Sequence, residues 1–223
     1  MPRLARTLIA APVLAAAVIG LTLAQPGVAA ASTVAALWKM DETSGTTMVD
    51  SSGNGNNGTL HHVALGAAGH FGKAYTFNGT SSYVSVPSSD SLNPASANIT
   101  ISFWLNTTHL PTSGDYDLVR KGAYPSQNYK AELLPTGQID CTFTGSSGAQ
   151  DVTGGSGLND GAWHKIQCVK TSPQIKVVVD GVVTTESATI GSITNTTEAD
   201  LGAHPDGGDW YNGELDQVSI AIG

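Results

Sequence analysis

The stretch that decides the fold class is residues 99–106, which read Ile-Thr-Ile-Ser-Phe-Trp-Leu-Asn. Apolar side chains stand at every second position, and polar residues or Trp104 stand between them. Successive side chains of a β-strand point to opposite faces, so this period of two predicts a strand with one buried face. Trp104 falls on the polar face, which we expect to look outward.

The same pattern continues on both sides of this stretch. Residues 175–179 alternate in the same way and end at Asp180-Gly181, a dipeptide that favours a tight hairpin. Turn residues recur at short intervals, and no sustained helical period follows the first thirty residues. Further apolar runs cover residues 34–40, 83–86, 118–119, 139–143, 163–169 and 215–222. Many short strands with regular turns predict an all-β protein, an antiparallel sandwich or barrel.

The composition excludes several classes of protein. Of the 223 residues, 40% are apolar and 13% are charged, which argues against a charged disordered tail and against a coiled coil. Only 10 residues are Lys or Arg, and the formal net charge is −8. We therefore expect no binding to nucleic acid and no attraction to an anionic membrane surface.

The first thirty residues have the three parts of a secretory signal peptide. Arg3 and Arg6 are followed by an apolar run over residues 8–23, and small residues at 28–32 offer a cleavage site. The alternative is an N-terminal membrane anchor, for which the run is short, since a spanning helix needs about 20 apolar residues. We expect a signal peptide at 1–30 and a single secreted domain at 31–223, with no membrane insertion after cleavage.

The two cysteines are expected to form a disulfide. Cys141 shares a strand face with Ile139 and Phe143, and Cys168 shares one with Ile166. Both thiols would thus be buried in a protein exported to an oxidising compartment. Closing a loop of about 28 residues would stabilise the fold by roughly 3–4 kcal/mol in the chain-entropy model. The alternative is two separate buried thiols that act as small hydrophobic residues.

A series of short motifs along the chain resembles a known family. The motifs are Leu37-Trp38-Lys39-Met40-Asp41-Glu42, the Gly- and Asn-rich segment 50–58, residues 77–84, Ile101-Ser102-Phe103-Trp104, Asp160-Gly161-Ala162-Trp163-His164, Val179-Asp180-Gly181 and Gly213-Glu214-Leu215-Asp216. In this order they resemble the laminin-G-like modules of the concanavalin A-like lectin/glucanase superfamily. The resemblance implies a two-sheet antiparallel jelly roll with neighbouring termini. It also implies extracellular binding of glycans or proteins, often with calcium.

The superfamily contains glucanases, so we tested the sequence for their carboxylates. Laminarinase-type enzymes carry Glu-x-Asp-x-x-Glu on one strand, which aligns a nucleophile and an acid/base along one cleft. Glu214-Leu215-Asp216 matches the first half, but Val218 and Ser219 stand where the second Glu would be. The sequence therefore favours a non-catalytic module over a hydrolase.

A metal site is expected in the loop Asp50–Gly58. Calcium is bound by carboxylate, amide and backbone carbonyl oxygens, and this loop offers Asp50, Asn54 and Asn56 on a Gly-rich backbone. Asp216 could join them from the last strand if the termini are close. The alternative is a tight turn whose Asn and Gly residues adopt left-handed backbone angles.

Two loops and one strand are expected to bind a ligand. Sugars stack on aromatic rings while polar groups fix their hydroxyls, and the segment 200–212 combines both kinds of group. The candidate ligand-binding residues are Asp206, Asp209, Trp210 and Tyr211 in that segment, Tyr124 and Tyr129 around a second loop, and Trp104 on the outward strand face. Trp210 could instead anchor its loop onto the sandwich.

The leading hypothesis is a secreted, non-catalytic module that binds a carbohydrate or polysaccharide with the help of calcium. One alternative is a secreted glycoside hydrolase or polysaccharide lyase of the same fold, with carboxylates assembled from distant parts of the chain. Another is an extracellular module that binds a protein partner.

Overall fold

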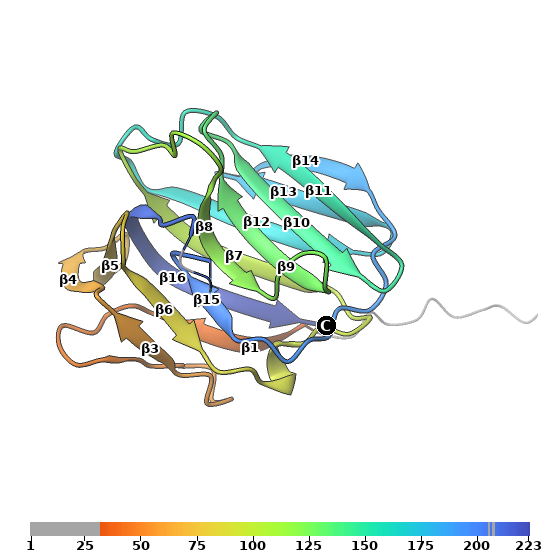
Figure 1. The fold of residues 1–223 in the computed structure, drawn as a ribbon, viewed down its shortest axis with the longest axis horizontal. Helices are drawn as coiled ribbons and strands as arrows, with labels where there is room; N and C mark the ends of the chain where they lie inside the picture. The colour runs from red at the N-terminus through yellow and green to blue at the C-terminus, as the bar shows by residue number, and fades with distance from the viewer. Residues whose placement is uncertain (1–31, 205, 207) are drawn as a thin grey trace, which may run out of the picture. The chain divides into compact units, whose positions relative to one another are not determined.

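The strand predicted at residues 99–106 is β7 (Ile99–Asn106) in the computed structural model (Figure 1). The structure describes residues 32–204, 206 and 208–223, so the predicted signal peptide lies outside the described residues. Ile99, Ile101, Phe103 and Leu105 are buried, as their spacing predicts. Trp104 is half-buried on the opposite face.

Two antiparallel sheets make up the fold. The first sheet has the order β14 (Val182–Ser187), β13 (Gln174–Val179), β12 (His164–Thr171), β7, β16 (Asn212–Ile222), β5 (Lys73–Asn78) and β4 (Ala64–Ala68), with β1 (Thr33–Trp38) also on β16. The second sheet has the order β11 (Gly148–Gly154), β10 (Ile139–Gly145), β9 (Asn128–Leu133), β8 (Tyr116–Lys121), β15 (Ala199–Leu201), β6 (Tyr83–Val86), β3 (Gly58–His61) and β2 (Thr47–Met48). A short 3-10 helix, Asp90–Leu92, follows β6. The predicted all-β jelly-roll sandwich is confirmed.

The hydrophobic core lies between the two sheets. It is built from the inward-facing residues of both, including Phe103 on β7 and Phe143 on β10. Trp38 on β1 is fully buried, and its ring N–H donates to the carbonyl of Asn56 at 2.7 Å. This bond satisfies the one polar atom of the ring and fixes the loop that follows β2.

The disulfide between Cys141 and Cys168 is confirmed. Cys141 lies on β10 in the second sheet and Cys168 on β12 in the first, so the bond crosses the core and joins the two sheets. Both cysteines are fully buried, and their Cα atoms are 5.4 Å apart, within the range that a disulfide bridges without backbone movement.

The hairpin at Asp180-Gly181 joins β13 to β14. Val179 pairs with Val182, and both turn residues have positive φ, 50° at Asp180 and 84° at Gly181. Such angles match the right-handed twist of the flanking strands. The first and last strands, β1 and β16, pair antiparallel, so that Thr33 lies opposite Ile222. No helix in the described part of the chain is long and apolar enough to cross a membrane.

Candidate functional site

The outer face of the second sheet carries buried charged residues. Tyr129, Ala131 and Leu133 of β9 point into the core, so Lys130 and Glu132 between them point outward. Cross-strand partners extend this face in both directions: Asp140 and Asp117 lie opposite Glu132, Arg120 lies opposite Lys130, and Asp200 lies opposite Arg120. Asp117 and Asp200 are each 1% exposed and Glu132 is 4% exposed, which is rare for charged side chains.

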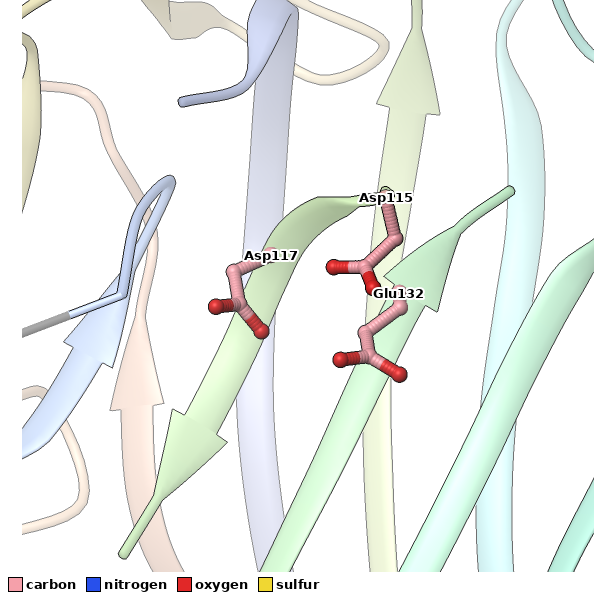
Figure 2. A group of neighbouring side chains, drawn as sticks. All are labelled: Asp115, Asp117 and Glu132. Carbon is pink, nitrogen blue, oxygen red and sulfur yellow. The ribbon is translucent and has the colours of Figure 1, made fainter. Parts of the chain in front are cut away.

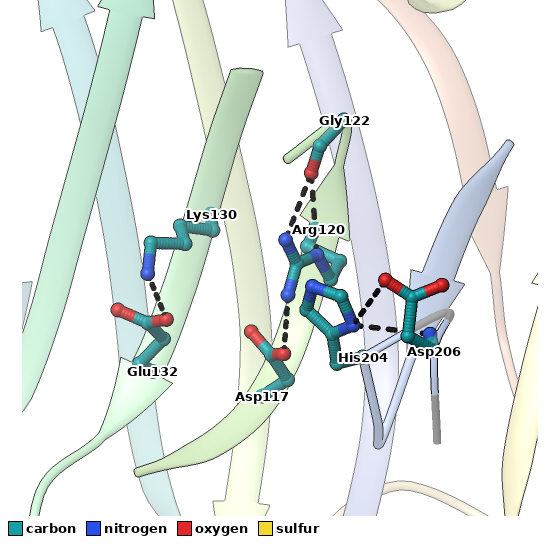
Figure 3. Close-up of polar contacts among 7 residues, drawn as sticks. All are labelled: Asp117, Arg120, Gly122, Lys130, Glu132, His204 and Asp206. Carbon is teal, nitrogen blue, oxygen red and sulfur yellow. Dashed lines mark hydrogen bonds and ion pairs between the residues drawn. The ribbon is translucent and has the colours of Figure 1, made fainter. Parts of the chain in front are cut away.

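A β-bulge in β8 places Asp117 and Arg120 on the same face. The pairing of β8 with β9 shifts between Asp117 and Val119, so two residues three apart both face outward. Arg120 donates to the Oδ2 atom of Asp117 at 2.6 Å and to the carbonyl of Gly122 at 3.0 Å, while Lys130 pairs with Glu132 (Figure 3). The two cations of this face are thus already engaged.

The carboxylates of the face outnumber these cations. They are Asp115, Asp117, Glu132, Asp140 and Asp200, which we call the acidic face. Among the described residues, one oxygen of Asp115, one of Asp117, one of Asp140 and both of Asp200 have no hydrogen-bond partner. Full ionisation would leave a formal charge of about −3 in this region, and unpaired buried charge is costly.

Burial shifts the protonation of this face. Removal from water raises the pKa of Asp200 to about 7, and the nearby Glu198 adds to that shift. Burial also raises the pKa of Glu132 to about 8, although the ammonium of Lys130 opposes the shift. At Asp115, burial and the neighbouring Asp209 carboxylate both raise the pKa. Each shift has the same physical cause, since the charged form of a carboxyl group is disfavoured away from water.

Three members of the acidic face converge. One oxygen each from Asp115, Asp117 and Glu132 lies within 4.8 Å of the other two (Figure 2). Asp115 precedes β8, Asp117 belongs to that strand, and Glu132 comes from the neighbouring strand β9. No other group of three such residues of the described chain meets this spacing.

A polar hollow opens beside this group. It has a volume of about 340 Å³ and is lined by Gly79, Pro111, Thr112, Ser113, Asp115, Tyr116, Asp209 and Trp210. The backbone N–H of Asp117 donates to the carbonyl of Asp209 at 3.0 Å, which docks the loop after β15 against the start of β8. Trp210 packs its ring edge on Tyr83, with 5.9 Å between ring centroids. Asp115 therefore belongs both to the acidic face and to the wall of the hollow.

The predicted ligand-binding residues do not converge. Asp209 and Trp210 line the hollow, but Asp206 is exposed and its backbone N–H donates to His204. Tyr124 is 79% exposed on its loop and does not line this hollow.

The assignment of Tyr129 and Tyr211 to a ligand surface is wrong. Both are fully buried. The Tyr129 hydroxyl donates to the carbonyl of Leu92, and the Tyr211 hydroxyl donates to the carbonyls of Asn106 and Glu214. These rings fill the core while their hydroxyls satisfy backbone acceptors, so neither can reach a ligand.

Trp104 lies on the other sheet, away from the hollow. It faces outward from β7 and stacks on His70 at 3.5 Å between ring centroids, with Phe71 packed edge-on. Asp216 is its cross-strand neighbour on β16 and accepts a hydrogen bond from the backbone of Phe71 at 2.8 Å. The sequence correctly places Trp104 on an outer face, but that face belongs to the first sheet.

The predicted metal set of Asp50, Asn54, Asn56 and Asp216 does not form. The two oxygens of Asp50 accept from the backbones of Leu37, Ser52 and Asn56 and from the Ser52 hydroxyl. Burial alone would raise the pKa of Asp50, but these hydrogen bonds stabilise its charged form and together lower the pKa. Asn54 and Asn56 both donate to the carbonyl of Ala35. The polar side chains of the loop are thus engaged in hydrogen bonds within the protein, as expected for a tight turn, which was the alternative interpretation.

Asp216 is separated from that loop by strand β1. Trp38 of β1 pairs with Val218 on one side and bridges to Asp50 on the other. Two strand spacings amount to about 10 Å, roughly twice the separation that two ligands of one calcium ion allow. The expectation that close termini would bring Asp216 to the loop is therefore wrong, although the first and last strands do pair.

The two antiparallel sheets define a jelly-roll β-sandwich. A laminin-G family model, described as the concanavalin A-like lectin/glucanases superfamily, matches residues 78–221, and the chain belongs to this family. Neurexin 1 of Drosophila melanogaster is 30% identical over 92 residues, which cover 39% of this chain and 5% of neurexin. The chain thus spans only a small part of that relative.

Solved structures share the fold at low sequence identity. The binding domain of Paraclostridial mosquitocidal protein 1 matches with a TM-score of 0.68 and 19% identity, over 84% of this chain and 48% of that one. Domain 4 of AbnA, a GH43 extracellular arabinanase of Geobacillus stearothermophilus solved with arabinotriose, matches with a TM-score of 0.61 and 20% identity, over 86% and 93%. The binding domain of botulinum neurotoxin DC, solved with SialylT, matches with 0.63 and 13% identity, over 84% and 47%.

Proposed function

We propose that this protein is a secreted carbohydrate-binding module that takes a neutral glycan in the hollow between Asp115 and Trp210. The observation that carries the proposal is the lining of this hollow, which joins two carboxylates, several hydroxyls and one indole ring. Carboxylates accept hydrogen bonds from sugar hydroxyls, and an aromatic ring packs against the apolar face of a sugar.

The charge of the hollow favours neutral over anionic sugars. Asp115 and Asp209 both contribute carboxylates to its wall, and the acidic face lies behind Asp115. An anionic glycan would add like charge to a region that already carries unpaired carboxylates. Hydroxyl donors of a neutral sugar would instead satisfy these acceptors.

The comparisons support a glycan ligand of this kind. The arabinanase domain, of which this chain covers 93%, was solved with a neutral oligosaccharide, arabinotriose. The toxin domain solved with SialylT is covered over 47% of its length, so this chain corresponds to about half of it. We therefore choose arabinotriose as the first probe and a sialylated oligosaccharide as the contrasting one.

Isothermal titration of the purified domain with arabinotriose tests the proposal. We expect measurable binding of arabinotriose and at least tenfold weaker binding of the sialylated oligosaccharide, a difference of about 1.4 kcal/mol. Trp210→Ala should weaken arabinotriose binding at least tenfold. Trp104→Ala removes the same kind of ring from the other sheet and should leave the affinity within twofold.

Four results would count against this assignment. Equal loss of affinity in both tryptophan variants would remove the hollow from consideration, and tighter binding of the sialylated sugar would contradict the charge argument. New reducing ends after incubation with arabinan would favour the hydrolase alternative. Binding to no glycan of a neutral panel would shift the weight to a protein partner.

Export is part of the same proposal. The basic start, apolar run and small residues of segment 1–30 are those of a secretory signal peptide. Mass spectrometry of the protein from the culture medium should give a chain that begins near residue 31. A chain that keeps these residues and stays in the membrane fraction would support the anchor instead.

A further inference from the structure

We propose that Asp115, Asp117 and Glu132 bind a calcium ion at the edge of the acidic face, beside the hollow. The proposal concerns the ion alone and stands without the glycan proposal, because its test uses no sugar. Asp115 is half-buried and lines the hollow, so an ion can enter from solvent. Asp117 and Glu132 lie deeper, at 1% and 4% exposure.

The spacing of the oxygens fits one ion. Calcium–oxygen distances are about 2.3–2.6 Å, so two ligands of the same ion can be at most about 5 Å apart. One oxygen from each of the three carboxylates meets this limit, since all lie within 4.8 Å of one another (Figure 2). The three side chains come from two adjacent strands, whose hydrogen-bonded register opposes Asp117 to Glu132.

Free oxygens are available for the ion. Arg120 engages only the Oδ2 atom of Asp117, and the Oδ1 atom is buried without a partner. Lys130 engages only the Oε1 atom of Glu132, and the Oδ1 atom of Asp115 also lacks a partner. An unpartnered carboxylate oxygen at 1% exposure is a rare and costly arrangement unless a cation, a proton or a water satisfies it.

A second observation comes from carboxylates outside the group of three. Asp140 lies opposite Glu132 and keeps a buried Oδ1 atom without a partner, and Asp200 lies opposite Arg120 with both oxygens unpartnered. Both are at least nine-tenths buried. The acidic face thus holds five carboxylates against two engaged cations, and a bound divalent ion would remove two of the excess charges.

Calcium suits this site better than magnesium. Calcium accepts six to eight oxygens in a flexible arrangement, whereas magnesium demands a near-ideal octahedron and sheds its waters reluctantly. The group combines two aspartates with one longer glutamate, and it lies next to a hollow that can supply water and backbone oxygens. This arrangement fits the flexible coordination of calcium better than the octahedron of magnesium. The ammonium of Lys130 pairs with the Oε1 atom of Glu132, where it balances part of the charge.

Thermal unfolding of residues 31–223 with calcium chloride or with EDTA tests the proposal. At a free calcium concentration 100-fold above the dissociation constant, we expect the melting temperature to rise by about 5–10 °C. Asp115→Asn, at the accessible member, should remove most of this rise. The matched control Asp206→Asn changes an exposed aspartate and should keep it.

Terbium provides a second readout that does not depend on stability. Tb³⁺ at this site should be sensitised by Tyr116, which lies next to Asp115 and lines the same hollow, and calcium should displace it. Glu132→Gln should lower terbium affinity at least tenfold, measured on folded protein even if its melting temperature falls. Asp50→Asn should change neither the affinity nor the calcium-induced shift.

The outcomes separate the possible explanations. A calcium-dependent rise that is lost in Asp115→Asn and Glu132→Gln and kept in both controls would support the site. No rise at 10 mM calcium would overturn it and leave protons to neutralise the acidic face. A rise that survives in Asp115→Asn and Glu132→Gln, or disappears in Asp50→Asn, would place the ion elsewhere and also overturn it.

Discussion

Removal of the disulfide should cost the fold several kilocalories per mole. Cys141 and Cys168 are separated by 27 positions, and their bond joins the two sheets through the core. For a closed loop of about 28 residues, the chain-entropy model gives about 3.6 kcal/mol at 25 °C. In a domain of this size one kilocalorie shifts the melting temperature by about 2–4 °C, so we expect a fall of about 7–14 °C.

Urea unfolding of three species tests this magnitude. The species are the oxidised protein, the same protein after unfolding and refolding in reductant, and the double variant Cys141→Ala/Cys168→Ala. The reduced protein keeps both buried sulfurs, so its loss reports the chain constraint alone. The double variant also loses two sulfur atoms from the core, which adds about 1 kcal/mol for each small cavity. The double variant should not respond to reductant.

One result would refute the reasoning. If the reduced protein and the double variant both lose less than 1 kcal/mol, the bond does not constrain the unfolded chain as the loop length requires. A loss confined to the double variant would assign the effect to packing. The slope of the unfolding free energy against urea must also be compared, because a change in slope indicates a change in the unfolded state.

Two further predictions concern buried polar groups. Asp200 has a folded pKa raised to about 7, so the folded state holds a proton between pH 4 and 7 that the unfolded state has released. Its contribution to the unfolding free energy is therefore greatest at low pH and declines through this window by up to about 1.4 kcal/mol per pH unit. Asp200→Asn should flatten this decline, which urea unfolding from pH 4 to 8 would measure. Tyr211→Phe should lower the unfolding free energy by about 1–2 kcal/mol, because the hydrogen bonds of its hydroxyl to the carbonyls of Asn106 and Glu214 are lost. The same variant should leave the affinity for arabinotriose unchanged. A loss of sugar binding without a loss of stability would contradict the placement of Tyr211 in the core.

Much of the fold could be predicted from local patterns. Three features that depend on neighbouring residues alone are present in the structure as expected. They are the strand at residues 99–106, the turn at Asp180-Gly181 and the disulfide between the two cysteines with apolar strand neighbours. The alternation also placed Trp104 outward, since its own strand fixes which face it takes. The pattern of a single strand does not indicate which sheet the strand joins. The sequence therefore could not show that Trp104 lies on the outer face of the first sheet while Trp210 lines the hollow.

The acidic face was missed for a physical reason. The bulge in β8 breaks the period of two, so Asp117 and Arg120 do not look like residues of one face. Glu132 and Asp140 belong to different strands, and only their register brings them together. One signal was available: Tyr129, Ala131 and Leu133 alternate with Lys130 and Glu132, which predicts that Tyr129 points inward and the charged pair outward.

The pairing of the first and last strands has a mechanical consequence. Thr33 lies opposite Ile222, and the pairing runs inward from there to Trp38 opposite Val218. A force that pulls these two ends apart would act on the hydrogen bonds of β1 one pair after another, as in opening a zipper, rather than on all of them in shear. The strand β1 should therefore detach at low force, and the cross-linked strands β10 and β12 should resist longest, because a covalent bond holds them together.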